Sequence, residues 1–320
     1  MAGGATRIQS VAQPPLTELA SGLRFPEGPI ALPNGDVLLV EIARGTLNRI
    51  EATSGRNIVV AQLGGGPNGT AIGPDGHCYV CNNGGFRWIE DEHGLRPAGQ
   101  SADYSGGSIQ RVNLETGAFE TLYTRAGKHP LRGPNDIVFD KLGGFWFTDN
   151  GKGRERELDR GGVYYAKADG SCISEAVYPM LTPNGIGLSP DEDVLYVAET
   201  FTGRVWAFDI GAPGQIDKRP WPSPNGGRVL AGLPGFELLD SMAVDSAGNV
   251  CVATLYKGGI TVVAPSGEVL QHVPLPDPFT TNICFGAAGL KTAYATLSHT
   301  GRLVSFPWEV GGLALNFLNK

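Results

Sequence analysis

The 320-residue sequence has few cysteines, no long apolar run and no cluster of basic residues. Its five cysteines are odd in number and scattered, which excludes the dense disulfide framework of small secreted domains. No stretch approaches the roughly 20 apolar residues of a membrane-spanning helix. The formal net charge of −7 argues against a nucleic-acid surface, which needs clustered Lys and Arg. We therefore expect a cytoplasmic protein that binds neither nucleic acid nor membrane.

Several common functional motifs are also missing. The segment GGGPNGT at 64–70 resembles a phosphate-binding loop, but no GK[ST] follows it. No GxSxG nucleophile elbow occurs, which argues against covalent serine catalysis. Cys78 and Cys81 have CxxC spacing, yet residues three apart on a strand point to opposite faces, so we interpret them as small strand residues. Residues 1–15 lack the apolar segment of a secretory signal and are expected to form a flexible tail.

What the sequence does contain is turn-forming residues. It has 47 glycines and 23 prolines, together with 41% hydrophobic and 18% charged residues. This composition is typical of a globular protein with many tight turns. It favours an all-β fold.

One pattern recurs six times along the chain: a turn with Pro or Gly, a polar residue, an apolar strand, a second turn and another apolar strand. The copies are FPEGPIALPNGDVLLVEI, GPNGTAIGPDGHCYVCNN, GPNDIVFDKLGGFWFTDN, TPNGIGLSPDEDVLYVAET, LLDSMAVDSAGNVCVATL and TTNICFGAAGLKTAYATL. They recur about every 50 residues, which leaves room for four strands of about 5–6 residues each.

Six such repeats predict a six-bladed β-propeller with four antiparallel strands per blade. The last copy shows only three strands. The early segment LTELA at 16–20 can supply the fourth and close the ring, which would remove an exposed edge. Residues 16–320 are then a single domain. A pair of β-sandwiches is the alternative architecture.

In a propeller the first strand of each blade lines the central channel, and all six first strands enter it from the same face. The polar residues at these entry points should therefore meet around the axis: Glu27, Asn68, Asn135, Asn184, Asp240 and Asn282. The loops that follow the second strands should lie over the same face, and they carry Asn83, Asp149, Glu199 and His299. The alternative for any single Asn is that it satisfies the backbone of its own turn.

Two carboxylates, Glu27 and Asp240, and two amides, Asn135 and Asn184, offer oxygen ligands at this axis. Carboxylates clustered in a narrow channel repel one another, and a divalent cation removes that conflict. Because no thiolate or histidine cluster is present to select a softer metal, we expect one Ca²⁺ ion, with Mg²⁺, Mn²⁺, Zn²⁺ or Fe²⁺ as alternatives.

The motifs PEGP, PNDIVFDKLGGFWFTD, PNGIGLS, DSMAVDSAGNVCVAT and TTNICFG resemble those of the SMP-30/gluconolactonase/LRE family and, more distantly, diisopropyl fluorophosphatase. The resemblance runs from about residue 20 to 308. It implies a six-bladed propeller with metal-dependent lactonase activity. It also implies that the metal ligands are Glu27, Asn135, Asn184 and Asp240, and that Arg132 contacts substrate. His299 resembles a channel-mouth histidine of the phosphotriesterase branch.

We therefore expect hydrolysis of a small sugar-type or aliphatic lactone by a metal-activated water. Asp240 is the first candidate for general base and His299 the second. The further substrate-binding candidates are Asn68, Asn83, Trp88, Arg132, Asp149 and Glu199. Trp88 lies in the long segment 84–107, which could fold over the site as a lid or remain a surface loop. Residues 152–160 read most simply as a solvated loop.

Two other functions stay open. The same metal geometry could support phosphotriester hydrolysis, or the ion could merely tie the blades of a non-catalytic binding propeller together. A closed propeller needs no partner to complete its sheets, so a monomer or weak homodimer is expected.

Overall fold

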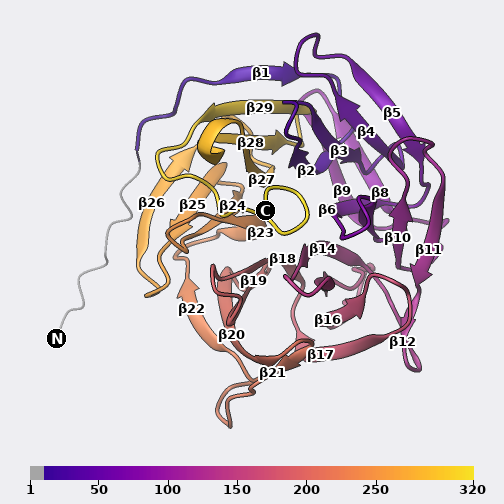
Figure 1. Cartoon of the computed structure of the whole chain (residues 1–320), viewed down its shortest axis with the longest axis vertical. Helices are drawn as coiled ribbons and strands as arrows, with labels where there is room; N and C mark the ends of the chain where they lie inside the picture. The colour runs from indigo at the N-terminus through magenta and orange to yellow at the C-terminus, as the bar shows by residue number, and fades with distance from the viewer. Residues whose placement is uncertain (1–10) are drawn as a thin grey trace.

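The computed structural model describes residues 11–320, which form a ring of six antiparallel sheets around a central channel (Figure 1). Blade 1 comprises β2 (Pro26–Ala31), β3 (Val37–Glu41), β4 (Thr46–Ile50) and β5 (Asn57–Gln62). Blade 2 comprises β6 (Pro67–Ile72), β7 (Cys78–Asn82), β10 (Ser108–Val112) and β11 (Phe119–Tyr123). Blade 3 comprises β14 (Pro134–Phe139), β15 (Gly144–Asp149), β16 (Gly161–Lys167) and β17 (Ile173–Met180).

Blade 4 comprises β18 (Pro183–Leu188), β19 (Val194–Glu199), β20 (Arg204–Ala212) and β22 (Arg228–Gly232), with the short β21 (Gln215–Ile216) also paired to β20. Blade 5 comprises β23 (Leu238–Val244), β24 (Val250–Leu255), β25 (Gly259–Val263) and β26 (Val269–Pro274). Blade 6 comprises β27 (Thr280–Gly286), β28 (Thr292–Leu297), β29 (Arg302–Pro307) and β1 (Thr17–Ala20). The predicted six-bladed architecture is confirmed.

The ring closes through its N-terminal strand, as predicted. β1 pairs antiparallel with β29, so that Thr17 faces Ser305 and Ala20 faces Leu303. Figure 1 shows this indigo strand lying outside the yellow strands of the last blade. Of the predicted tail at 1–15, residues 1–10 lie outside the described residues, and the Val11 amide donates a hydrogen bond to the His272 carbonyl.

Six hydrophobic clusters hold the blades together, one at each interface between neighbouring blades. Alternate residues of a strand enter opposite interfaces. In β3, Leu38 and Val40 pack toward blade 2, whereas Val37 and Leu39 pack toward blade 6. This explains why the second strands read as continuous apolar runs, since both of their faces are buried. Cys78 and Cys81 likewise enter two different clusters as buried free thiols.

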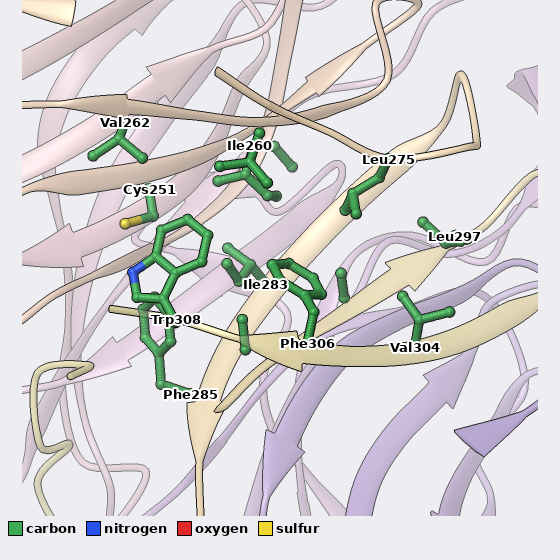
Figure 2. Packing of buried hydrophobic residues seen from close by; sticks show 14 residues of the cluster. Cys251, Ile260, Val262, Leu275, Ile283, Phe285, Leu297, Val304, Phe306 and Trp308 are labelled. Carbon is green, nitrogen blue, oxygen red and sulfur yellow. The ribbon is translucent and has the colours of Figure 1, made fainter. Parts of the chain in front are cut away.

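The interface between blades 5 and 6 shows how aromatic residues fill these clusters (Figure 2). The Trp308 ring lies 5.6 Å from Phe285 and 6.0 Å from Phe306, measured between ring centroids. Such buried aromatic contacts contribute about 0.5–1.5 kcal/mol beyond area burial.

One end of the channel is covered by the C-terminal segment, which ends at the centre of the ring in Figure 1. The Leu313 amide donates to the Val244 carbonyl, and the Asn316 side chain donates to the Phe139 carbonyl. A largely apolar cavity of about 110 Å³ lies between this segment and the inner strands. The C-terminal segment therefore covers one face of the channel.

The remaining elements are two hairpins and one short helix. β8 (Phe86–Asp91) pairs with β9 (Gly94–Gln100), and β12 (Arg125–Ala126) pairs with β13 (His129–Pro130). The 3₁₀ turn η1 (Ala288–Leu290) precedes β28. Residues 11–320 contain no helix long and apolar enough to cross a membrane.

Candidate active site

Each inner strand carries a β-bulge at its channel mouth. In blade 1, Glu27 pairs with Val40 but Ile30 pairs with Leu38, so the inner strand contains one extra residue there. The same register shift occurs at the mouths of β6, β14, β18, β23 and β27. A bulge re-aims the side chains around it. The repeated bulge therefore explains why the six polar residues share one level of the channel.

The bulges also bring neighbouring inner strands into backbone contact. Gly28, at φ 54°, has no room for a side chain because a Cβ atom would lie 2.4 Å from the Asn68 carbonyl oxygen. A Cβ atom on Gly69 would lie 2.5 Å from the Asn135 carbonyl oxygen. This close approach is available to glycine alone and narrows the channel at the level of the polar residues.

Glu27 is a buried carboxylate, and Asp240 is a half-buried one that feels the charge of Glu27. The Glu27 side chain accepts hydrogen bonds from the Asn282 amide at 2.8 Å and from the Gly28 backbone amide at 2.7 Å. Burial raises the pKa of Glu27 despite these donors. Burial and the nearby charge of Glu27 together raise the pKa of Asp240 well above its ordinary value, while the Asn184 amide lowers it. The two carboxylates thus lie close to each other and to Asn184.

The donor atoms fit a divalent cation. Asn135 Oδ1 is buried and finds no hydrogen-bond partner among the described residues. Burial raises the pKa of both Glu27 and Asp240, the charges of Glu27 and Asp136 raise that of Asp240 further, and no basic group contributes to either shift. A cation would coordinate the unpaired oxygen and offset the repulsion between the carboxylates. Within residues 11–320, no group of three His, Cys, Asp or Glu side chains is placed to bind a metal, so an ion here depends on amide oxygens as well.

Asp136 is a third acid in the channel, and it was not among the predicted site residues. Burial, followed by the charge of Glu27, raises the pKa of Asp136 to about 7. Asp136 also lines the cavity beside the C-terminal segment. A signal was present in the repeats, where the residue after each polar position is Gly28, Gly69, Asp136, Gly185, Ser241 and Ile283. Asp136 is the one charged member of that set.

Asp149 and Glu199 hold the loops at the channel mouth through hydrogen bonds. The Asp149 carboxylate accepts the backbone amides of Arg132 and Gly133, each at 2.7 Å. Glu199 accepts the Leu181 amide at 2.7 Å and the Trp206 indole N–H at 3.0 Å. Each carboxylate therefore fixes the segment that leads into the inner strand of its own blade. The oxygens of both carboxylates thus accept hydrogen bonds from other groups of the protein.

The segment that was expected to form a lid or a surface loop forms the β8–β9 hairpin and lies against three other blades. Its Leu95 amide donates to the His299 carbonyl at 2.9 Å in blade 6. Its Glu90 side chain pairs with Arg24 before blade 1, with Nη2 and Oε2 2.7 Å apart. Its Gln100 amide donates to the Gly153 carbonyl at 2.9 Å beside blade 3. The hairpin thus bridges the mouth of the channel.

Lys152 anchors the base of this hairpin. Its ammonium group donates to Asn83 Oδ1 and to the Gly85 carbonyl, both at 2.9 Å, and lies 3.9 Å from the centroid of the Phe86 ring. Burial lowers the pKa of Lys152 to about 7, although Asp149 and Asp159 act in the opposite direction. The expectation that 152–160 is simply a solvated loop is therefore wrong at Lys152, which is fully buried.

The other candidate residues differ in their exposure. The Arg132 side chain is exposed at the mouth, whereas Asn68 and Asn83 are buried. Asn83 Nδ2 finds no hydrogen-bond partner among the described residues. Trp88 is half-buried in β8, with its ring 5.1 Å from Phe25.

His299 joins the hairpin to blade 6. Its Nδ1 atom lies 3.1 Å from the Leu95 carbonyl, and its ring stacks on Phe279 at 5.5 Å. The side chain is half-buried at the channel mouth. The contact through Nδ1 fixes the ring orientation and leaves Nε2 as the nitrogen available for further interactions.

Fold and site together define a six-bladed propeller with an oxygen-rich axial site that is covered on one side by a hairpin. The family model described as an SMP-30/gluconolactonase/LRE-like region matches residues 25–299. The chain belongs to this family, and the resemblance noted in its motifs is confirmed.

Relatives of this chain include named lactonases. A gluconolactonase of Zymomonas mobilis is 27% identical over 313 residues, which cover 89% of this chain and 79% of that protein. The lactonase drp35 of Staphylococcus saprophyticus is 28% identical over 275 residues, covering 84% and 76% respectively. The crystal structure of regucalcin from Agrobacterium tumefaciens, described as a calcium-binding protein, superimposes with a TM-score of 0.77 at 18% identity and covers 98% of this chain and all of that one (100%). This last likeness shows the fold.

Proposed function

We propose that the protein hydrolyses a small lactone, of sugar or aliphatic type, at the axial site, and that turnover depends on one divalent metal ion. The proposal rests above all on the convergence of buried carboxylate and amide oxygens that lack a cationic partner. Membership of a family with named lactonases supports the reaction class.

Glu27, Asn135, Asn184 and Asp240 would hold the ion. Because these donors are all oxygen atoms, Ca²⁺ is the first choice, and Mg²⁺, Mn²⁺, Zn²⁺ and Fe²⁺ are alternatives. A bound divalent cation supplies Lewis acidity, which polarises a lactone carbonyl and stabilises negative charge on its oxygen.

Asp240 acts in this proposal as the general base that accepts a proton from the attacking water. The water oxygen bonds to the carbonyl carbon, the ring C–O bond breaks, and the proton passes to the departing ring oxygen. The product is an open-chain hydroxy acid. His299 is the second candidate for proton transfer, because its Nδ1 contact with Leu95 orients the ring at the mouth.

Substrate contacts are proposed for four residues. Arg132 is exposed and its guanidinium makes no hydrogen bond with a described residue, so it is available to a polar group of the substrate. Asn83 offers a buried amide nitrogen without a partner. Asn68 shares the level of the metal ligands, and Trp88 lies in the bridging hairpin. Asp149 and Glu199 contribute by holding the loops around them.

We further propose that the enzyme works as a monomer or weak dimer in the cytoplasm. Closure of the ring by β1 leaves no unpaired blade that would require a partner chain. The free state of all five cysteines fits a reducing compartment.

The test is a lactone panel run with chelator-treated and metal-reloaded protein, with turnover followed by acid release. The proposal predicts that chelation abolishes lactone hydrolysis, that one molar equivalent of a divalent ion restores it, and that Asp240→Asn remains inactive. An organophosphate assay in parallel detects phosphotriesterase activity. A metal-loaded protein that hydrolyses no lactone would overturn the proposal and leave the binding propeller as the better account.

A further inference from the structure

Five aromatic residues form a continuous line of rings along the channel mouth. We name Phe236, Tyr256, Phe279, Phe25 and Trp88 the aromatic arc. Phe236 and Tyr256 stack in parallel at 5.4 Å, and Tyr256 meets Phe279 edge-on at 5.7 Å. Phe279 lies 6.1 Å from Phe25, which lies 5.1 Å from Trp88. Because these residues come from blades 5, 6, 1 and 2, the arc surrounds much of the mouth.

Three rings of the arc closely precede residues of the axial site in the chain. Phe25 comes two residues before Glu27, and Phe236 comes four residues before Asp240. Phe279 comes three residues before Asn282, the amide that is hydrogen-bonded to Glu27. These three rings thus lie in segments that lead into an inner strand, and Phe25 among them is buried in the cluster between blades 1 and 2.

The two rings at the blade 5 end of the arc are exposed and do not belong to the core. Phe236 is 77% exposed and Tyr256 is 49% exposed, so their stacked pair faces solvent. Leu181 and Phe201, at the mouth of blade 4, are also exposed. A group of exposed large apolar side chains commonly marks a binding surface.

The protein holds these rings in place at an energetic cost. Tyr256 has φ 65° and Phe25 has φ 57°, in a region that aromatic residues rarely adopt. The Tyr256 amide donates to the Pro278 carbonyl at 2.6 Å, and the ion pair of Lys257 with Glu237, at 3.0 Å, joins the two loops that carry the stacked rings. Backbone strain of this kind persists where the surroundings enforce it and clusters at ligand sites.

We infer that the aromatic arc binds the non-reacting part of the substrate, and that the preferred lactones carry a flat apolar group such as a phenyl ring. This inference rests on the proposed lactonase function and deepens it. A polyhydroxylated sugar lactone needs many hydrogen-bonding partners, and the arc offers few of them. An aryl group gains apolar burial and ring stacking. Arg132, in blade 3, remains available for the polar end of the molecule.

The experiment compares three lactones with the same six-membered ring: δ-phenyl-δ-valerolactone, δ-valerolactone and gluconolactone. The wild type should show its highest kcat/KM with the phenyl compound. Phe236→Ser and Tyr256→Ser should each raise its KM roughly 3- to 10-fold and change δ-valerolactone turnover less than about twofold. Trp221→Ser is the matched control, because Trp221 is 90% exposed in the β21–β22 connection at the opposite face.

The outcomes separate this inference from the proposed function. A wild type that prefers gluconolactone, or variants that lose turnover of all three lactones equally, would overturn the inference and leave the lactonase function intact. If no lactone is hydrolysed, calorimetric titration with the phenyl-substituted δ-lactam tests whether the arc binds this ligand. Binding by the wild type that both serine variants weaken supports the arc as a ligand surface, and absence of binding rejects it.

Discussion

The Asn282 amide donates a hydrogen bond of 2.8 Å to Glu27 Oε2, although the two residues are 255 positions apart in the chain. This contact joins the inner strand of the last blade to that of the first, at the level of the proposed metal ligands. It therefore couples closure of the ring to the geometry of the site. Two features close the ring where blade 6 meets blade 1: the pairing of β1 with β29 at the rim and the hydrogen bond of Asn282 at the axis.

Replacing Asn282 by Ala should destabilise the metal-free protein. The change leaves a buried Glu27 oxygen with the Gly28 amide as its remaining close donor, and loss of one buried hydrogen-bond partner costs about 1–3 kcal/mol. Denaturant unfolding in the presence of chelator measures this free energy. Asn34→Ala, at an exposed turn, is the control. Equal unfolding midpoints for Asn282→Ala and the wild type would contradict the role assigned to the contact.

Asp136→Asn should weaken divalent-ion binding about tenfold, which corresponds to about 1.4 kcal/mol. The Asp136 charge acts on Asp240 and responds to that of Glu27, so its removal takes negative charge from beside the ion. Calorimetric titration of chelator-treated protein with Ca²⁺ gives the affinity. Asp140→Asn is the control, since Asp140 is buried at the far end of β14. An unchanged affinity for Asp136→Asn would remove this residue from the site.

Lys152 should make stability rise with pH. Its folded-state pKa of about 7 lies below the ordinary value of 10.5, so between these values the unfolded chain binds the proton that the folded chain releases. The free energy of unfolding should then increase by up to about 1.4 kcal/mol per pH unit within that window. In Lys152→Met this slope should vanish. Urea unfolding of both proteins from pH 6.5 to 10 measures it, and parallel curves would refute the assignment.

Gly94→Ala should detach the hairpin tip from blade 6. A Cβ atom on Gly94 would lie 2.1 Å from the His299 carbonyl oxygen, so the β8–β9 hairpin must move. Amide hydrogen exchange in residues 86–100 should become faster, and KM for lactones should rise. Gly106→Ala is the matched control, because Gly106 also has a positive φ but has no atom within 4 Å of an added Cβ. Equal exchange in both variants would show that the hairpin does not depend on this contact.

The sequence predicted the ring because each blade repeats a local pattern of turns and apolar strands. It placed Glu27, Asn135, Asn184 and Asp240 at equivalent positions because the inner strands share one register, and the structure shows that a bulge fixes that position in every blade. Local patterns of this kind are visible without knowledge of tertiary contacts.

The missed features depend on contacts between distant parts of the chain. Lys152 is buried because Asn83, 69 residues earlier, accepts its hydrogen bond. The hairpin at 86–100 is ordered by His299, whose ring contacts a residue 204 positions away. Charge patterning around 152–160 indicated a solvated loop, and the partners that override that indication cannot be read from the neighbouring sequence.

The central claim is that four side chains hold one divalent ion at the axis of the ring. Anomalous diffraction from a crystal grown with Mn²⁺ tests it most directly. We predict a single strong peak in the channel, within about 2.0–2.6 Å of oxygens from Glu27, Asn135, Asn184 and Asp240. A protein that hydrolyses lactones while its crystals show no metal within reach of these oxygens would contradict the account.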